Sequence, residues 1–161
     1  MVVQNGHSAP VSANAALACS LSPRSGVEPA RLVEWAGLAV RSRREKFTLQ
    51  ALAHAYYRAG RFDQTVKLLQ EAMTLSDPEP QSNAAFPLAL AYHGLGQKEE
   101  SRKWYKIGIA ELENITPRNP GDPVSWAPGH WLGVNVWYRE AKAVFSEDSA
   151  VKKEDQEKSK P

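Results

Sequence analysis

The chain has 161 residues, of which 42% are hydrophobic, enough for one domain with a modest core and too few for two. Its 20 Lys and Arg residues nearly balance its 18 Asp and Glu residues, so the charge gives no reason to expect nucleic acid or a membrane as partner. The single cysteine, Cys19, excludes an internal disulfide. No apolar run is long enough to span a membrane. Residues Met1 to Ser20 contain no Lys or Arg, although a signal peptide would begin with a positively charged segment. We therefore expect a cytoplasmic protein.

The first part of the chain predicts a degenerate helical hairpin over residues 12–43, after a disordered N-terminus at residues 1–8. A short helix around Asn14 to Leu21 precedes a loop. A second helix begins at Pro29, a residue that the first turn of a helix tolerates, and ends near Arg43. Apolar residues recur along it at helical spacing, at Leu32, Trp35, Ala36 and Ala39.

The strongest helix signal lies between Glu45 and Ala59, where Gly60 is expected to end the helix. Its core-facing stripe is Leu49, Leu52, Ala53 and Tyr56. A partner helix is predicted from Arg61 to about Leu75, and the proline-rich residues 76–80 must break it. Since the turn at Gly60 is short, the two helices are expected to be antiparallel and to form one repeat over residues 45–78.

The same pattern returns 36 residues further along, where Leu52 to Gly60 is matched by Leu88 to Gly96. The second copy, residues 81–115, pairs a helix ending near Gly96 with a helix over Gln97 to Asn114. Its expected inward positions are Ala85, Leu88, Ala89 and Tyr92 on the first helix, and Ser101, Tyr105 and Gly108 on the second. A repeat of this length is typical of stacked helical hairpins, because one hairpin cannot bury its apolar side alone.

The last third of the chain predicts a loop over residues 116–129, a closing helix over residues 130–145 and a charged, disordered tail over residues 146–161. The closing helix carries an apolar stripe that includes Trp131, Val134, Trp137, Tyr138 and Phe145. We expect it to pack on the Gln97 to Asn114 helix and to cap the array. An exposed aromatic patch for a partner is the alternative interpretation of its tryptophans.

The pattern Leu-Ala-x-x-Tyr-x-x-x-Gly, followed by Thr65 or Ser101 at a position where the family prefers Ala, resembles the tetratricopeptide repeat (TPR) over residues 45–115. The arrangement is similar to the C-terminal TPR segment of large bacterial proteins with a Ser/Thr kinase or WD40 region upstream. The resemblance implies an all-α fold of antiparallel helical hairpins, stacked as a short TPR-like solenoid with a C-terminal closing helix. The chain departs from the pattern at Leu49 and Ala85, where the family usually has a large aromatic residue.

The resemblance also implies a concave groove lined by the first helix of each hairpin. On this face we expect partner-binding residues that are more exposed than the Leu52 and Leu88 stripe: Gln50, His54, Tyr57, Arg58, Phe86, Leu90 and His93. The Lys, Asn and Arg clamp that some family members use for acidic peptide C-termini is absent from this face. The expected function is therefore a protein-interaction adaptor or scaffold that binds a peptide or helix of a partner, without catalysis, cofactor or metal.

Two alternatives remain open for the function. The chain can be the C-terminal regulatory part of a multi-domain Ser/Thr kinase or WD40 signalling protein, or, less favoured, a small enzyme on a helical scaffold. No catalytic motif is present, and His7, His54, His93 and His130 lack the spacing of metal ligands. The N-terminal end is also expected to expose apolar surface, so a homodimer through residues 10–40 is predicted if the chain is not part of a longer array.

Overall fold

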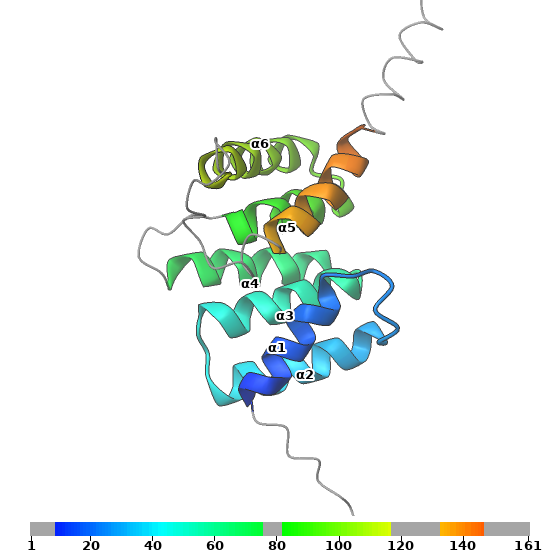
Figure 1. Ribbon diagram of the computed structural model, residues 1–161, viewed down its shortest axis with the longest axis vertical. Coiled ribbons are helices and arrows are strands. Elements are labelled where there is room, and N and C mark those ends of the chain that lie inside the picture. The colour runs from blue at the N-terminus through cyan, green and yellow to red at the C-terminus, as the bar shows by residue number, and fades with distance from the viewer. Residues whose placement is uncertain (1–8, 76–81, 117–132, 147–161) are drawn as a thin grey trace, which may run out of the picture.

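The computed structural model describes residues 9–75, 82–116 and 133–146, and these residues contain seven helices and no strand (Figure 1). The predicted all-α class is therefore confirmed for the described part of the chain. The predicted disordered N-terminus at residues 1–8 lies outside the described residues. Residues 117–132, which include most of the predicted loop and Trp131 of the predicted closing helix, also lie outside the described residues. The same holds for residues 147–161 of the predicted tail.

The helices follow the predicted order. They are α1 (Ala9–Ser20), α2 (Pro29–Ser42), α3 (Lys46–Arg58), α4 (Phe62–Thr74), α5 (Ser82–Gly94) and α6 (Lys98–Ile115). The last one, residues 133–146, is called here the C-terminal helix. Helices next to each other in the sequence pack together from α1 to α6, and α1 also packs on α3. None of the described helices combines the length and the apolar character needed to cross a membrane.

Two glycines end the first helices of the hairpins, as predicted. Gly60 and Gly96 have φ of +69° and +72°, a left-handed conformation that side chains other than glycine rarely adopt. At Gly60 the Arg61 N–H donates to the Tyr56 carbonyl at 2.9 Å, and at Gly96 the Gln97 N–H donates to the Tyr92 carbonyl at 2.9 Å. These bonds satisfy carbonyl groups that the helix end would otherwise leave open, and they turn the chain into the antiparallel partner helix.

The 36-residue recurrence extends to a buried hydrogen bond inside each hairpin. The Thr65 hydroxyl donates to the Ala53 carbonyl at 3.2 Å, and the Ser101 hydroxyl donates to the Ala89 carbonyl at 2.7 Å. Both hydroxyl side chains are buried. The hydroxyls of Thr65 and Ser101 thus join the second helix of each hairpin to the backbone of the first helix. They do so because a buried hydroxyl needs a hydrogen-bond partner.

Close contact between α5 and α6 depends on Gly108. A Cβ atom at this position would lie 2.7 Å from Cε1 of Phe86, too close for any ordinary contact. Glycine therefore lets the Phe86 ring lie directly against the α6 backbone. Tyr138 of the C-terminal helix packs on the same ring.

The buried core lies in three clusters along the stack. The first joins α1, α2 and α3, the second joins α3, α4 and α5, and the third joins α5 and α6 to the C-terminal helix. Tyr92 is buried as predicted, but Tyr56 is only half-buried, and there the prediction is wrong. Tyr56 lies near the end of α3, where the Arg61 guanidinium covers its ring at 5.6 Å from the centroid and leaves part of the ring in solvent.

Candidate functional site

The C-terminal helix lies across α5 (Figure 1) and packs against the first helices of both hairpins, α3 and α5. The surface of α3 and α5 that it covers is called here the groove. The prediction placed it on α6 as an end cap. It does touch α6 through Tyr105, Ile109 and Leu112, but its most buried side chains face α3 and α5. The C-terminal helix thereby buries Val134, Trp137 and Ala141 of its apolar stripe.

Trp137 is the largest buried side chain of the C-terminal helix, with 1% of its surface exposed. Its ring meets Tyr57 edge to face at a centroid distance of 5.3 Å and His54 at 4.8 Å. The Arg58 guanidinium lies 4.5 Å from the centre of the same ring. Aromatic and cation–π contacts of this kind favour one orientation of the indole, in addition to the gain from burying it.

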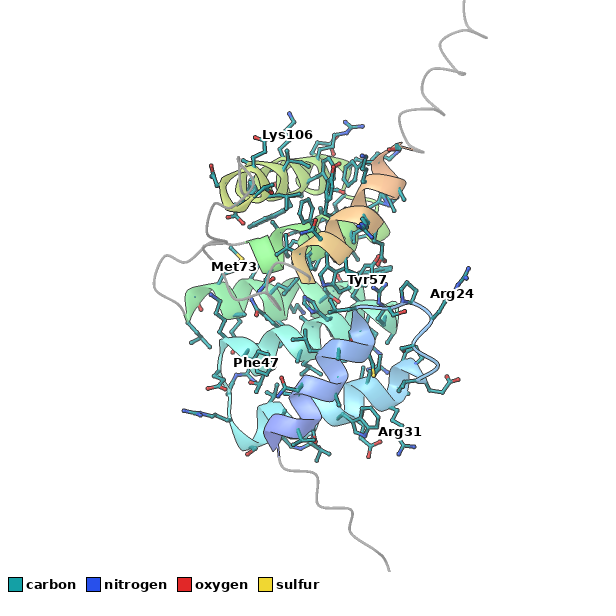
Figure 2. All side chains as sticks on the ribbon, viewed as in Figure 1. Arg24, Arg31, Phe47, Tyr57, Met73 and Lys106 are labelled. Atoms are coloured by element: carbon teal, nitrogen blue, oxygen red, sulfur yellow. The ribbon has the colours of Figure 1, made fainter. Side chains whose placement is uncertain are left out.

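An ion pair between Arg58 and Glu140 fixes the register of the helix in the groove. Arg58 Nη1 and Nη2 donate to the two oxygens of Glu140, each at 2.8 Å. The Tyr57 hydroxyl donates to Glu140 Oε1 at 2.9 Å, and Arg58 Nε donates to the Ser20 carbonyl at the end of α1 at 2.6 Å. Burial, and then the nearby carboxylate, raise the pKa of Tyr57 above its usual range. Figure 2 shows Tyr57 near the end of α3 that faces this helix.

The C-terminal helix also contacts α5 and α6 through aromatic rings. Tyr138 packs on Phe86 with a centroid distance of 5.4 Å. Further along, Phe145 stacks on Tyr105 of α6 with a centroid distance of 4.2 Å, and its ring also packs near His93 of α5 with a centroid distance of 6.3 Å. The C-terminal helix thus contacts both hairpins along its length, through Trp137, Tyr138, Glu140 and Phe145.

The prediction that the groove residues are more exposed than the Leu52 and Leu88 stripe holds for three of them, the half-buried Tyr57, Arg58 and His93. It is wrong for His54, Phe86 and Leu90, which are as buried as the stripe, and Gln50 is also buried. The C-terminal helix and α1 cover the face that these residues line. The residues do lie on one face, as predicted, but that face is occupied by the chain itself.

Sequence reasoning missed Glu140, the acidic partner of Arg58. Its signal was present: an acidic residue follows Trp137 by three positions, on the side of the helix that carries the apolar stripe. It also missed the Ser20 carbonyl, which no sequence signal could reveal, because a backbone acceptor has no residue type.

His54 is a buried histidine of α3. Burial lowers its pKa from 6.5 to about 3, and the Arg58 charge adds to this effect, while the nearby backbone of Asn83 opposes it. Neither ring nitrogen of His54 reaches a hydrogen-bond partner of ordinary geometry among the described residues. The neutral ring therefore serves in packing and cannot act as an acid or base near neutral pH. The described residues also hold no group of three or more His, Cys, Asp or Glu side chains that could bind a metal.

Comparison with known proteins gives no match, whether to a family model, to a curated protein or to a solved structure. The functional argument therefore depends on the geometry alone. The site can hold an amphipathic helix by inserting one tryptophan, by stacking aromatic rings and by pairing one carboxylate with Arg58.

Proposed function

We propose that the chain is a TPR-like protein-interaction module, acting in the cytoplasm, whose concave groove binds an amphipathic helix of a partner protein without catalysis. The observation that carries this proposal is the seating of a helix in the groove by aromatic and charged residues of α3 and α5. The recurrence of the glycine cap and of the hydroxyl–carbonyl bond after 36 residues supports the TPR-like stacking.

The C-terminal helix indicates what the partner helix carries. The contacts place Trp137 at the first position, Tyr138 next to it, Glu140 three residues on and Phe145 eight residues on. A partner helix with this pattern would use the same pockets and the same Arg58 guanidinium. Helix-in-groove recognition of this type is common among interaction modules.

Such a partner must displace the C-terminal helix, which competes from within the same chain. An intramolecular competitor acts at a high effective concentration, because it is held on the same chain as the groove. The native chain therefore binds a partner helix weakly unless its own helix is loosened. In this arrangement the C-terminal helix acts as an internal inhibitor of the groove.

A direct test uses the full chain and a dye-labelled peptide of residues 133–146, with fluorescence anisotropy as readout. The peptide should bind the Trp137→Ala chain, whose own helix is weakened, at least about tenfold more tightly than it binds the native chain. Arg139→Ala, on the exposed side of the same helix, is the matched control and should behave like the native chain.

Adding Tyr57→Ala and Phe86→Ala to the loosened chain should abolish peptide binding while the far-ultraviolet circular dichroism stays helical. Peptide binding that survives these two substitutions would place the interface elsewhere. Equal binding to the native and the Trp137→Ala chains would also contradict the proposal, because the groove would then not be the competing site.

The alternative that the chain is part of a longer array has support at its N-terminal end. Val11 on α1 and Leu38 on α2 are 52% and 45% exposed, as expected of an uncovered terminal repeat. This end fits either a preceding repeat of a kinase or WD40 protein or a second copy of the chain. Sedimentation at high concentration distinguishes the second case, since a clean monomer would exclude the homodimer through residues 10–40. The small-enzyme alternative gains no support from the described residues.

A further inference from the structure

His54 lies directly at the contact between the groove and the C-terminal helix. Its ring packs on the Trp137 indole at a centroid distance of 4.8 Å, and only 3% of the residue is exposed. Trp137 itself is 1% exposed, so no gap opens between the two rings and solvent. The C-terminal helix therefore supplies part of the cover that keeps the His54 imidazole away from water.

The charges on α3 and on the C-terminal helix do not favour a proton on His54. One turn further along α3, the Arg58 guanidinium lies over the same indole, and its charge opposes a second positive charge on His54. Glu140 is the only acidic residue of the C-terminal helix, and both of its oxygens accept hydrogen bonds from Arg58. The Tyr57 hydroxyl stays neutral in mild acid, because burial raises the pKa of this group.

The other elements around His54 add no compensating carboxylate. Helix α1, which contributes Leu17 beside His54, contains no charged residue. Helix α5 contributes Asn83, whose backbone favours the protonated ring but does not outweigh burial. The ionisable side chains of α5 are Tyr92 and His93, which lie at least about 13 Å further along the helix than Asn83. Among the described residues of these helices, none offers a carboxylate that is free to pair with a protonated His54.

A proton on His54 therefore costs more free energy while the C-terminal helix is in place than after it has left. With the helix in place, burial lowers the pKa of His54 from 6.5 to about 3. A ring that water reaches regains a pKa near its usual value of about 6.5. Between these pH values the released state takes up a proton that the packed state does not. Acid thus shifts the equilibrium toward release, by at most about tenfold per pH unit for one proton.

We propose that the groove is a pH-sensitive clamp, which holds a helix whose tryptophan packs on His54 near neutral pH and releases that helix in mild acid. For the C-terminal helix this depends only on the contact with Trp137. For a partner helix it rests on the proposed function, because a tryptophan of the partner must take the place of Trp137. The same proton weakens both occupants, so the groove empties in acid.

The test follows amide hydrogen exchange of the full chain by NMR from pH 7.5 to 5.0, with each rate corrected for the intrinsic pH dependence of exchange. Amides of the C-terminal helix should be less protected than amides of α4, because the helix leaves the groove without global unfolding. Their protection should fall below pH 6.5 by up to about tenfold per pH unit. Equal protection of the two helices, or constant protection of the C-terminal helix, would overturn the proposal.

The substitution His54→Phe keeps a ring that cannot take up a proton, so it should remove most of this pH dependence. Loosening that arises from Glu140 in acid remains in the variant, and the difference between the two chains isolates His54. His93→Phe is the matched control, since this half-buried histidine of α5 contacts the same helix through Phe145. It should respond to pH like the native chain.

His54→Gln provides a second variant without a titrating ring, and far-ultraviolet circular dichroism confirms at each pH that the variants remain folded. An equal loss of protection in the native chain and in a folded His54 variant would overturn the proposal. A native response that only the His54 variants lack would support it.

The partner is tested with the labelled peptide of residues 133–146 and the Trp137→Ala chain. Peptide binding should weaken between pH 7.5 and 5.5, by at most about tenfold per pH unit. Binding that does not change with pH would overturn the clamp for a partner helix. A peptide that fails to bind even at pH 7.5 would contradict the proposed function instead, and hydrogen exchange would still decide whether acid releases the C-terminal helix.

Discussion

Arg58 and Glu140 are 82 residues apart in the sequence, yet they form a two-pronged ion pair with both hydrogen bonds at 2.8 Å. The Arg58 side chain is 9% exposed and that of Glu140 is 24% exposed, so the pair is largely shielded from solvent. Shielded, two-pronged pairs have a stricter geometry than surface pairs, and removal of one partner leaves the other charge poorly solvated. This pair therefore determines where along the groove the C-terminal helix lies.

The first prediction is that Glu140→Ala lowers the free energy of unfolding by about 2 kcal/mol, because it leaves the Arg58 guanidinium without its carboxylate. Urea denaturation followed by circular dichroism measures the loss. The same variant should loosen the C-terminal helix and increase binding of the labelled peptide of residues 133–146.

The chain provides a matched control for this ion pair. Arg44 and Glu71 form a similar two-pronged pair at 2.7 and 2.6 Å, but on an exposed surface between the start of α3 and α4. Glu71→Ala should have a clearly smaller effect than Glu140→Ala, because solvent screens an exposed pair. Equal effects would show that burial of the Arg58–Glu140 pair does not matter.

The second prediction concerns pH. Burial lowers the pKa of His54 to about 3, from 6.5 in an unfolded chain, so the unfolded chain binds one more proton between these values. The contribution of the neutral His54 to the free energy of unfolding is therefore present in full above about pH 6.5. Below that pH the free energy of unfolding falls, by about 1.4 kcal/mol per pH unit for one proton. Denaturation curves from pH 7.5 to 4.5 measure it.

His54→Phe should flatten this pH dependence, since the new ring cannot take up a proton. NMR titration of the His54 ring in the native chain gives an independent measure. A ring that titrates near pH 6.5 in the folded chain, or an unchanged slope in the variant, would contradict the buried, neutral state of His54.

The third prediction concerns the contact between α5 and α6. Gly108→Ala should destabilise the fold by about 1–3 kcal/mol, because the added Cβ would lie 2.7 Å from the Phe86 ring. Gly37→Ala on α2 is the matched control. Its nearest neighbour, the end of the Arg41 side chain, would lie 3.6 Å away, so the better helix propensity of Ala should stabilise by about 0.5–1 kcal/mol. Thermal melting of both variants should show opposite shifts, and shifts of the same sign would contradict the packing.

The sequence was sufficient to predict the hairpins, because their signals are local. Gly60 and Gly96 end helices through backbone conformation, and the buried stripes follow the helical period. The contact of the C-terminal helix with α6 was predicted, but its contacts with α3 and α5 were missed, because an amphipathic stripe shows that a helix is buried but not against which surfaces. Its place depends on the match between Glu140 and Arg58, a long-range pairing that one sequence does not reveal. For the same reason the prediction missed the burial of His54, Phe86 and Leu90.

Trp137 and Tyr138 are neighbours in the sequence, yet they contact different hairpins: Trp137 packs on Tyr57 of α3 and Tyr138 packs on Phe86 of α5. A partner helix that displaces the C-terminal helix would therefore break both contacts together. By thermodynamic reciprocity, whatever stabilises the packing of the C-terminal helix weakens the apparent affinity for the partner by the same factor.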